Sequence, residues 1–204
     1  MAKVSAGIRR HEDMHMKLRL IIFAALAAVA SQAMAHEVIY AGTFTGTQEI
    51  PPNASPGSGT CLVTIDLDLL TMHLTGSFTG LTGTTTASHI HVAATQGVNG
   101  GVATETPSFN GFPLGVTSGS YDHTYDLSQA SAYNPAFVTA SGGTVSGALN
   151  AFLLGLSENR AYWNIHTSTF PGGELRANLT AVPEPASMTA LGLGIAAMLR
   201  RRRK

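Results

Sequence analysis

Three histidines have the side-chain type and the spacing from which a metal site can be built. His89 and His91 are separated by one residue in a stretch that alternates like a β-strand, so their imidazoles lie on one face. His166 lies on the polar face of a second strand-like segment. Because imidazole nitrogens bind zinc and copper, we expect the three side chains to hold one such ion if the two strands are neighbours.

The same three histidines also allow a structural interpretation. Histidines in a β-rich domain can hydrogen-bond to backbone carbonyls, or here to Asn164 and Glu174, and so fix one strand against the next. Alternation defines the faces of strands but not which strands are adjacent, so both hypotheses stand. Further candidate ligands or acceptors around the histidines are His73, Asp122 and His123.

The segment that positions His166 is expected to be a hairpin over residues 161–179. Apolar and polar residues alternate in two runs, and the proline and glycines at 171–173 supply the turn between them. The face that contains Trp163 is expected to pack in the core. Glu174 and Arg176 lie two residues apart and are expected to form ordinary polar pairs, with each other or across strands, with ligand binding as the alternative. The functional face of the hairpin comprises Asn164, His166, Glu174 and Arg176.

Other alternating segments predict an all-β domain. Apolar residues recur at spacings of three and four between positions 134 and 156, which indicates one or two short helices. Short strands with turn signals and one helical insertion are typical of an antiparallel β-sandwich or Greek-key barrel. The loop at 97–115 is too long for a routine connection and is expected to carry function. Strands are expected at 38–47, 60–68, 71–79, 88–92 and 120–127.

The domain expected over residues 36–181 is acidic. It contains no lysine, two arginines and nine acidic residues, which gives a net charge near −7. This charge argues against nucleic acid and anionic membrane surfaces as partners, because both require basic patches. Its single cysteine, Cys61, has no partner for an internal disulfide and is expected to be buried among apolar neighbours.

The N-terminal residues 1–35 have the features of a secretory signal peptide. A basic start is followed by an apolar run over 20–30 and by a small-residue cleavage site before His36. Met16 immediately precedes the basic region and is an alternative start of translation. We therefore expect export across a membrane.

The C-terminal residues 182–204 contain Pro183, Glu184 and Pro185, then an apolar run over 186–199, then a cluster of arginines. An apolar run of this length spans about 21 Å as a helix against a hydrocarbon core of about 30 Å, so it is a marginal transmembrane segment. The cationic end is expected to stay in the cytoplasm. A plain membrane anchor is one interpretation.

This tail resembles the PEP-CTERM protein-sorting signal, because the Pro-Glu-Pro motif, the short apolar helix and the arginine cluster occur in that order. The resemblance implies processing by an exosortase-type membrane protease and only transient anchoring through the C-terminal helix. It further implies a Gram-negative bacterium, with the processed protein at the cell surface or in the extracellular matrix.

A second resemblance covers most of residues 38–179. The segments 88–93, 162–167 and 171–176, together with the opening segment 42–52, are similar to the CHRD domain. The chain departs from the usual pattern at Val92-Ala93, where the family has Gly-Pro, and at Ala177, where it has Gly. The resemblance implies an immunoglobulin-like or superoxide-dismutase-like Greek-key β-sandwich with a role in protein binding.

Together these features predict an exported, surface- or matrix-associated binding protein without catalytic activity. Its expected partners are the processing protease and extracellular polysaccharide or surface proteins. The alternative is a copper- or zinc-binding metalloprotein of superoxide-dismutase-like architecture, since Cu,Zn superoxide dismutase also combines a His-x-His pair with a distant histidine. The histidines that would bind the metal are His89, His91 and His166.

Overall fold

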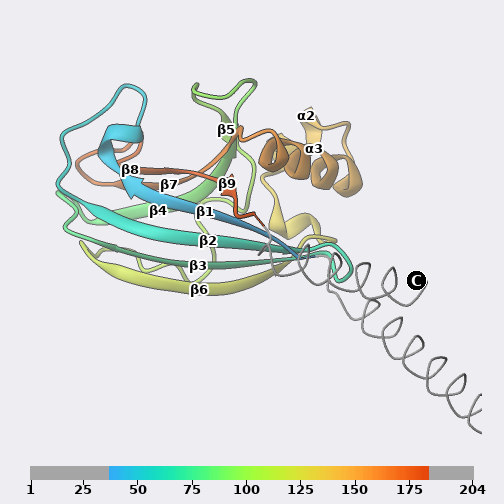
Figure 1. Ribbon diagram of the computed structural model, residues 1–204, viewed down its shortest axis with the longest axis horizontal. Helices are drawn as coiled ribbons and strands as arrows, with labels where there is room; N and C mark the ends of the chain where they lie inside the picture. The colour runs from blue at the N-terminus through green and yellow to red at the C-terminus, as the bar shows by residue number, and fades with distance from the viewer. Residues whose placement is uncertain (1–36, 184–204) are drawn as a thin grey trace, which may run out of the picture. The chain divides into compact units, whose positions relative to one another are not determined.

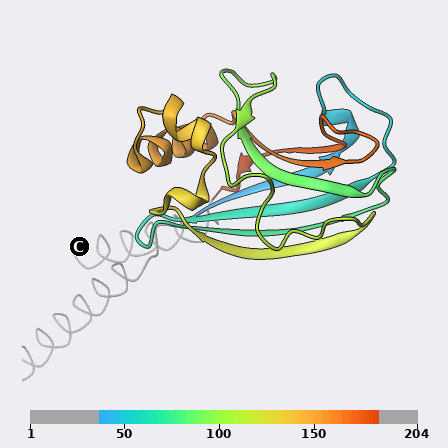
Figure 2. The ribbon, with the colours of Figure 1, turned by 180° about the vertical axis from the view of Figure 1, so that it is seen from behind.

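The computed structural model describes residues 37–183, whose strands join into one antiparallel sheet. The order is β5-β4-β7-β8-β1-β2-β3-β6, with β9 paired to β1. The sheet curls so that β4 and β7 face β3 and β6 across the core (Figures 1 and 2). The strands are β1 (Glu37–Thr45), β2 (Ser58–Asp66), β3 (Thr71–Thr79), β4 (Thr85–Val92), β5 (Gly101–Val102), β6 (Gly119–Asp126), β7 (Ala161–Thr167), β8 (Leu175–Asn178) and β9 (Thr180–Ala181).

Two short helices follow β6 and precede β7. α2 (Pro135–Ala140) and α3 (Val145–Ser157) lie together at one end of the sheet (Figure 1). Single 3-10 turns, η1 (Gly46–Gln48) and η2 (Ala130–Ala132), complete the regular structure of the described residues. Asn134 and Thr144 are the N-caps of the two helices. The side-chain oxygen of each accepts a hydrogen bond from a backbone N–H of the first helical turn.

The all-β prediction is confirmed, and two helices occur where one or two were expected, with α3 ending one residue beyond the predicted interval. The expected strands are all present, with ends displaced by three residues or fewer. No helix within residues 37–183 has the length and apolar character needed to cross a membrane. The predicted signal peptide and the predicted transmembrane segment at 186–199 lie outside the described residues.

Trp163 on β7 explains how the sheet closes over its core. Its ring contacts Phe44 on β1, which only β8 separates from β7, and Tyr121 on β6, the last strand of the sheet order. The indole nitrogen donates to the Ser88 hydroxyl at 2.7 Å, so its only polar atom is satisfied while buried. Trp163 therefore fixes β7 with its apolar face inward, as predicted, and its other face toward the covering loops.

The polar face of β7 and β8 is buried as well. Tyr162, Asn164 and Arg176 are 3%, 2% and 2% exposed, because two segments distant in sequence cover them. Glu49, just after η1, accepts a hydrogen bond from the Asn164 amide at 2.7 Å. Asn99, in the loop between β4 and β5, accepts one from Arg176 at 3.0 Å. The polar side chains on this face therefore lie in an enclosed environment of low dielectric constant.

Glu174 is a structural anchor, and the predicted pair with Arg176 does not form. Its fully buried carboxylate accepts four hydrogen bonds of 2.5–3.2 Å from segments on several sides. Arg176 instead donates to the loop between β4 and β5 and to its own strand. The donors to Glu174 are the hydroxyls of Ser55 and Thr167 and the backbone N–H groups of Thr82 and Gly83.

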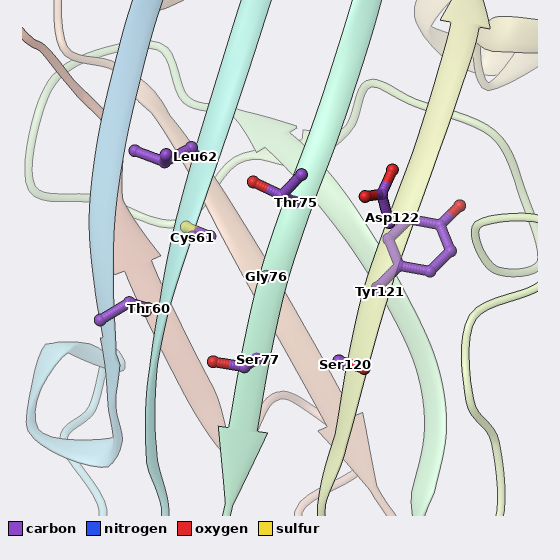
Figure 3. A pocket seen from close by; sticks show the side chains of 9 residues that line it. All are labelled: Thr60, Cys61, Leu62, Thr75, Gly76, Ser77, Ser120, Tyr121 and Asp122. Carbon is purple, nitrogen blue, oxygen red and sulfur yellow. The ribbon is translucent and has the colours of Figure 1, made fainter.

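Cys61 is buried and has no disulfide partner, as predicted. Burial raises the pKa of its thiol to about 12, so it stays protonated and inert at neutral pH. A shallow groove of about 380 Å³ lies above it on the outer face of β2, β3 and β6 (Figure 3). The residues that line this groove are Thr60, Cys61, Leu62, Thr75, Gly76, Ser77, Ser120, Tyr121 and Asp122.

Candidate metal centre

The strand order places β4 and β7 side by side, which sequence spacing could not establish. In their antiparallel register His89 pairs with Asn164, and His166 pairs with Ala87. His89, His91 and His166 therefore share one face of two neighbouring strands. One ring nitrogen from each histidine lies within 4.8 Å of the corresponding nitrogens of the other two. These residues form the three-histidine centre.

Each imidazole of the three-histidine centre is held by a backbone carbonyl from a different loop. The nitrogen–oxygen distances are 2.7, 3.0 and 2.9 Å. Because a carbonyl oxygen only accepts, the nitrogen that contacts it must carry the proton. This assigns the protons to His89 Nε2, His91 Nδ1 and His166 Nδ1. The pairs are His89 with Pro107, His91 with Gly100 and His166 with Pro171.

The opposite nitrogens of the three rings are buried and have no hydrogen-bond partner. They are His89 Nδ1, His91 Nε2 and His166 Nε2, and each is a lone-pair acceptor in the assigned tautomer. Buried acceptors without donors are rare and costly in folded proteins. One water has two protons and satisfies two of the three nitrogens at most, whereas one metal ion satisfies all three.

Burial keeps the three imidazoles neutral. It lowers the pKa of His89, of His166 and, most strongly, of His91, whose pKa falls to about 4. Each carbonyl partner acts in the opposite direction, and the mutual proximity of the rings lowers the pKa of His89 and His91 further. The neutral ring with one free lone pair is the form that binds metals, so the centre needs no proton loss at pH 7.

A stack of three side chains fixes the orientation of His91. Its ring lies parallel to that of Tyr162, with an 8° interplanar angle and centroids 4.9 Å apart. The Arg176 guanidinium lies 3.5 Å from the Tyr162 ring centroid. The Tyr162 hydroxyl accepts from the Gly100 N–H at 3.0 Å, so it also holds the loop whose carbonyl anchors His91. Such outer contacts orient metal-binding imidazoles.

Arg176 fastens the covering loop above the polar face of β7 and β8. It donates to the Val98 carbonyl at 3.1 Å and to the Asn99 side chain at 3.0 Å. Asn99 in turn donates to the Ile50 carbonyl at 2.7 Å, which joins this loop to the segment after η1. Both covering segments are thus tied to each other and to the strand beneath them.

Most of the other sequence-predicted ligands do not join the centre. Asn164 lies between the histidines in register, and its amide donates to Glu49, whose pKa burial raises. His73 and Asp122 bond to each other at 2.9 Å across exposed positions of β3 and β6. His123 lies against the ring of the neighbouring Tyr125 on β6. Among the described residues, His73, Asp122, His123 and Glu174 therefore lie outside the group of close donor atoms, whereas the Asn164 Oδ1 is buried and has no hydrogen-bond partner.

Several groups at the centre were not found from the sequence. The three anchoring carbonyls have no side-chain signature, although the segment predicted to be a functional loop, 97–115, which β5 divides into two loops, supplies those of Gly100 and Pro107. Glu49 reaches the polar face from a segment more than a hundred residues away from Asn164. No local pattern reports such a long-range contact.

Two family models match this chain. The family model of the CHRD domain matches residues 40–179, and the PEP-CTERM protein-sorting motif matches residues 181–204. The first match covers more than half of the chain, so the protein belongs to the CHRD domain family. The sorting motif marks it as a bacterial protein exported to the cell envelope or surface through an exosortase-type system. Searches of curated proteins and of solved structures found no match.

Proposed function

We propose that this exported CHRD domain binds one transition-metal ion, copper or zinc, through His89, His91 and His166. One observation carries the proposal: three neutral imidazoles bring one ring nitrogen each within 4.8 Å of the other two, and each ring has one buried nitrogen without a hydrogen-bond partner. A polar network that served only to join strands would pair these nitrogens with donors. The donor type suits both copper and zinc.

The role is binding rather than catalysis in this proposal. The three donor nitrogens are shielded from solvent, and no acidic side chain of the described residues belongs to the cluster to move a proton. Three protein ligands leave a fourth position for a water or a small ligand. The carbonyl anchors come from three separate loops, so an ion would also tie these loops together.

The proposal also covers the type of β-sandwich and the final location of the protein. The curled sheet, with β4 and β7 packed over β3 and β6, supports an arrangement of the immunoglobulin-like or superoxide-dismutase-like type. The sorting motif supports a final position at the cell surface or in the matrix of a Gram-negative bacterium. Extracellular polysaccharide or surface proteins are the partners available there.

The test is elemental analysis of the full chain after loading with copper or zinc and removal of free metal. We expect one ion per chain in the unmodified protein and less than about a tenth of that in His89→Ala and in His166→Ala, because two imidazoles cannot close the site. His73→Ala and His123→Ala are matched controls outside the cluster and should keep full stoichiometry. A folded chain that binds neither metal, or a His166→Ala variant that binds fully, would contradict the proposal.

A further inference from the structure

We propose that Asn164 supplies the fourth ligand of the metal site through its side-chain oxygen, Oδ1, and that Glu49 holds the Asn164 amide in the orientation this requires. This inference rests on the proposed metal-binding function and names the group that fills the fourth position. With the three histidines alone, that position would be left to a water or a small ligand.

The first argument is that Asn164 shares both the burial and the missing partner of the three histidines. Within residues 37–183, four buried side-chain nitrogen or oxygen atoms have no hydrogen-bond partner. Three of them are the free ring nitrogens of the three-histidine centre, and the fourth is Asn164 Oδ1. The Asn164 side chain is an acceptor at a residue that is only 2% exposed. Because buried acceptors without donors are rare and costly, a set of four on two paired strands indicates a common ligand.

The second argument is the position of Asn164 in the sheet. In the register of β4 and β7 it lies directly opposite His89, and the Cβ atoms of such a pair are about 4.5–5.5 Å apart. His91, two residues along β4 on the same face, is its diagonal neighbour. His166 lies two residues further along β7, also on that face. Asn164 is therefore a near neighbour of all three histidines.

The third argument is that all four side chains are held in the same way. Each histidine donates one ring N–H to a backbone carbonyl and keeps its opposite nitrogen free. Asn164 donates its amide nitrogen to Glu49 Oε1 at 2.7 Å and keeps its amide oxygen free. Since the nitrogen faces Glu49, the oxygen is the atom left to bind an ion. Acceptors behind metal-binding histidines orient them and raise their basicity, and Glu49 does the same for this amide.

The experiment is a zinc titration of the full chain, followed by NMR of the Asn164 side chain and of the histidine rings. We expect one equivalent of zinc to shift the Cγ and Nδ2 resonances of Asn164 together with the free ring nitrogens. Shifted histidines with an unshifted Asn164 side chain would overturn this inference and leave the proposed function standing. Zinc that shifts none of these groups would overturn both.

The zinc affinity of an Asn164 variant tests direct binding separately. Asn164→Leu keeps the size of the side chain but removes the oxygen, so the dissociation constant for zinc should rise at least about tenfold. Asn150→Leu, at an exposed position of α3, is the matched control and should stay within about threefold of the unmodified chain. Unchanged affinity in a folded Asn164→Leu protein would contradict the inference. If that variant does not fold, the NMR titration of the unmodified chain decides.

Glu49→Gln tests the positioning role of Glu49. Loss of an outer partner typically weakens metal binding by about 10–100-fold, so we expect at least a tenfold rise in the dissociation constant for zinc. The same substitution in the Asn164→Leu background should change it by less than about threefold, because Glu49 acts through Asn164. Equal effects in the two backgrounds would show that Glu49 acts on the site independently of Asn164 and would contradict its assigned role.

Discussion

Saturating copper(I) or zinc is expected to raise the melting temperature of the full chain by about 5–10 °C, and His166→Ala is expected to abolish that rise. An ion present at a hundred times its dissociation constant stabilises the folded state by about 2.7 kcal/mol. For a domain of this size each kcal/mol corresponds to about 2–4 °C. The ion joins β4, β7 and three loops, all of which separate on unfolding.

The metal-free His166→Ala protein provides the informative comparison. The substitution removes a buried nitrogen that has no partner, which offsets part of the packing lost with the ring. We therefore expect the metal-free variant to melt within a few degrees of the metal-free parent, so that the main difference appears only with metal. His73→Ala, at an exposed position on β3, should keep the full rise. Scanning calorimetry with and without metal measures both, and an equal rise in His166→Ala would contradict the account.

Replacing Glu174 is expected to cost about 3–5 kcal/mol of unfolding free energy in Glu174→Ala. The fully buried carboxylate accepts four hydrogen bonds from four residues, and its loss leaves their donors without partners. Urea unfolding at pH 7 measures the change. Glu158→Ala removes an exposed acid paired with Arg160 and should cost less than about 1 kcal/mol. A loss below 1 kcal/mol in Glu174→Ala would show that the anchor is unimportant.

The same anchor predicts a pH dependence. Burial alone would raise the pKa of Glu174, but its four hydrogen bonds outweigh burial and lower the pKa in the folded state. A lowered folded-state pKa contributes stability above the unfolded-state value of about 4.3, and that contribution is lost as pH falls through the folded-state value. The stability difference between the unmodified chain and Glu174→Gln should therefore be constant from pH 7 to pH 5 and shrink below about pH 4.

The features that could be predicted from the sequence are those set by the alternation of apolar and polar residues along a strand. The period of two along residues 161–167 correctly placed Trp163 in the core and His166 on the opposite face. The same pattern placed His89 and His91 together. Strand faces follow from neighbouring residues, because successive side chains point to opposite sides of a sheet.

The unpredictable part depends on contacts between distant segments. That β4 lies beside β7 is a property of the sheet order, in which strands about 75 residues apart pair. The role of Glu174 as an anchor could not be predicted, because three of its four donors, two of them backbone N–H groups, come from segments about 90 and 120 residues away. Arg176 looked like its partner because they are neighbours in sequence, but a covering loop provides better acceptors.

The most direct test of the three-histidine centre is the protonation state of each ring nitrogen, measured by long-range ¹H–¹⁵N NMR on the full chain. Without metal we predict protonated His89 Nε2, His91 Nδ1 and His166 Nδ1, as their carbonyl partners require. One equivalent of zinc or copper(I), both diamagnetic, should shift the three opposite nitrogens and leave these protons in place. A metal-free protein with any of the three rings in the other tautomer, or a titration that leaves one ring unshifted, would contradict the account.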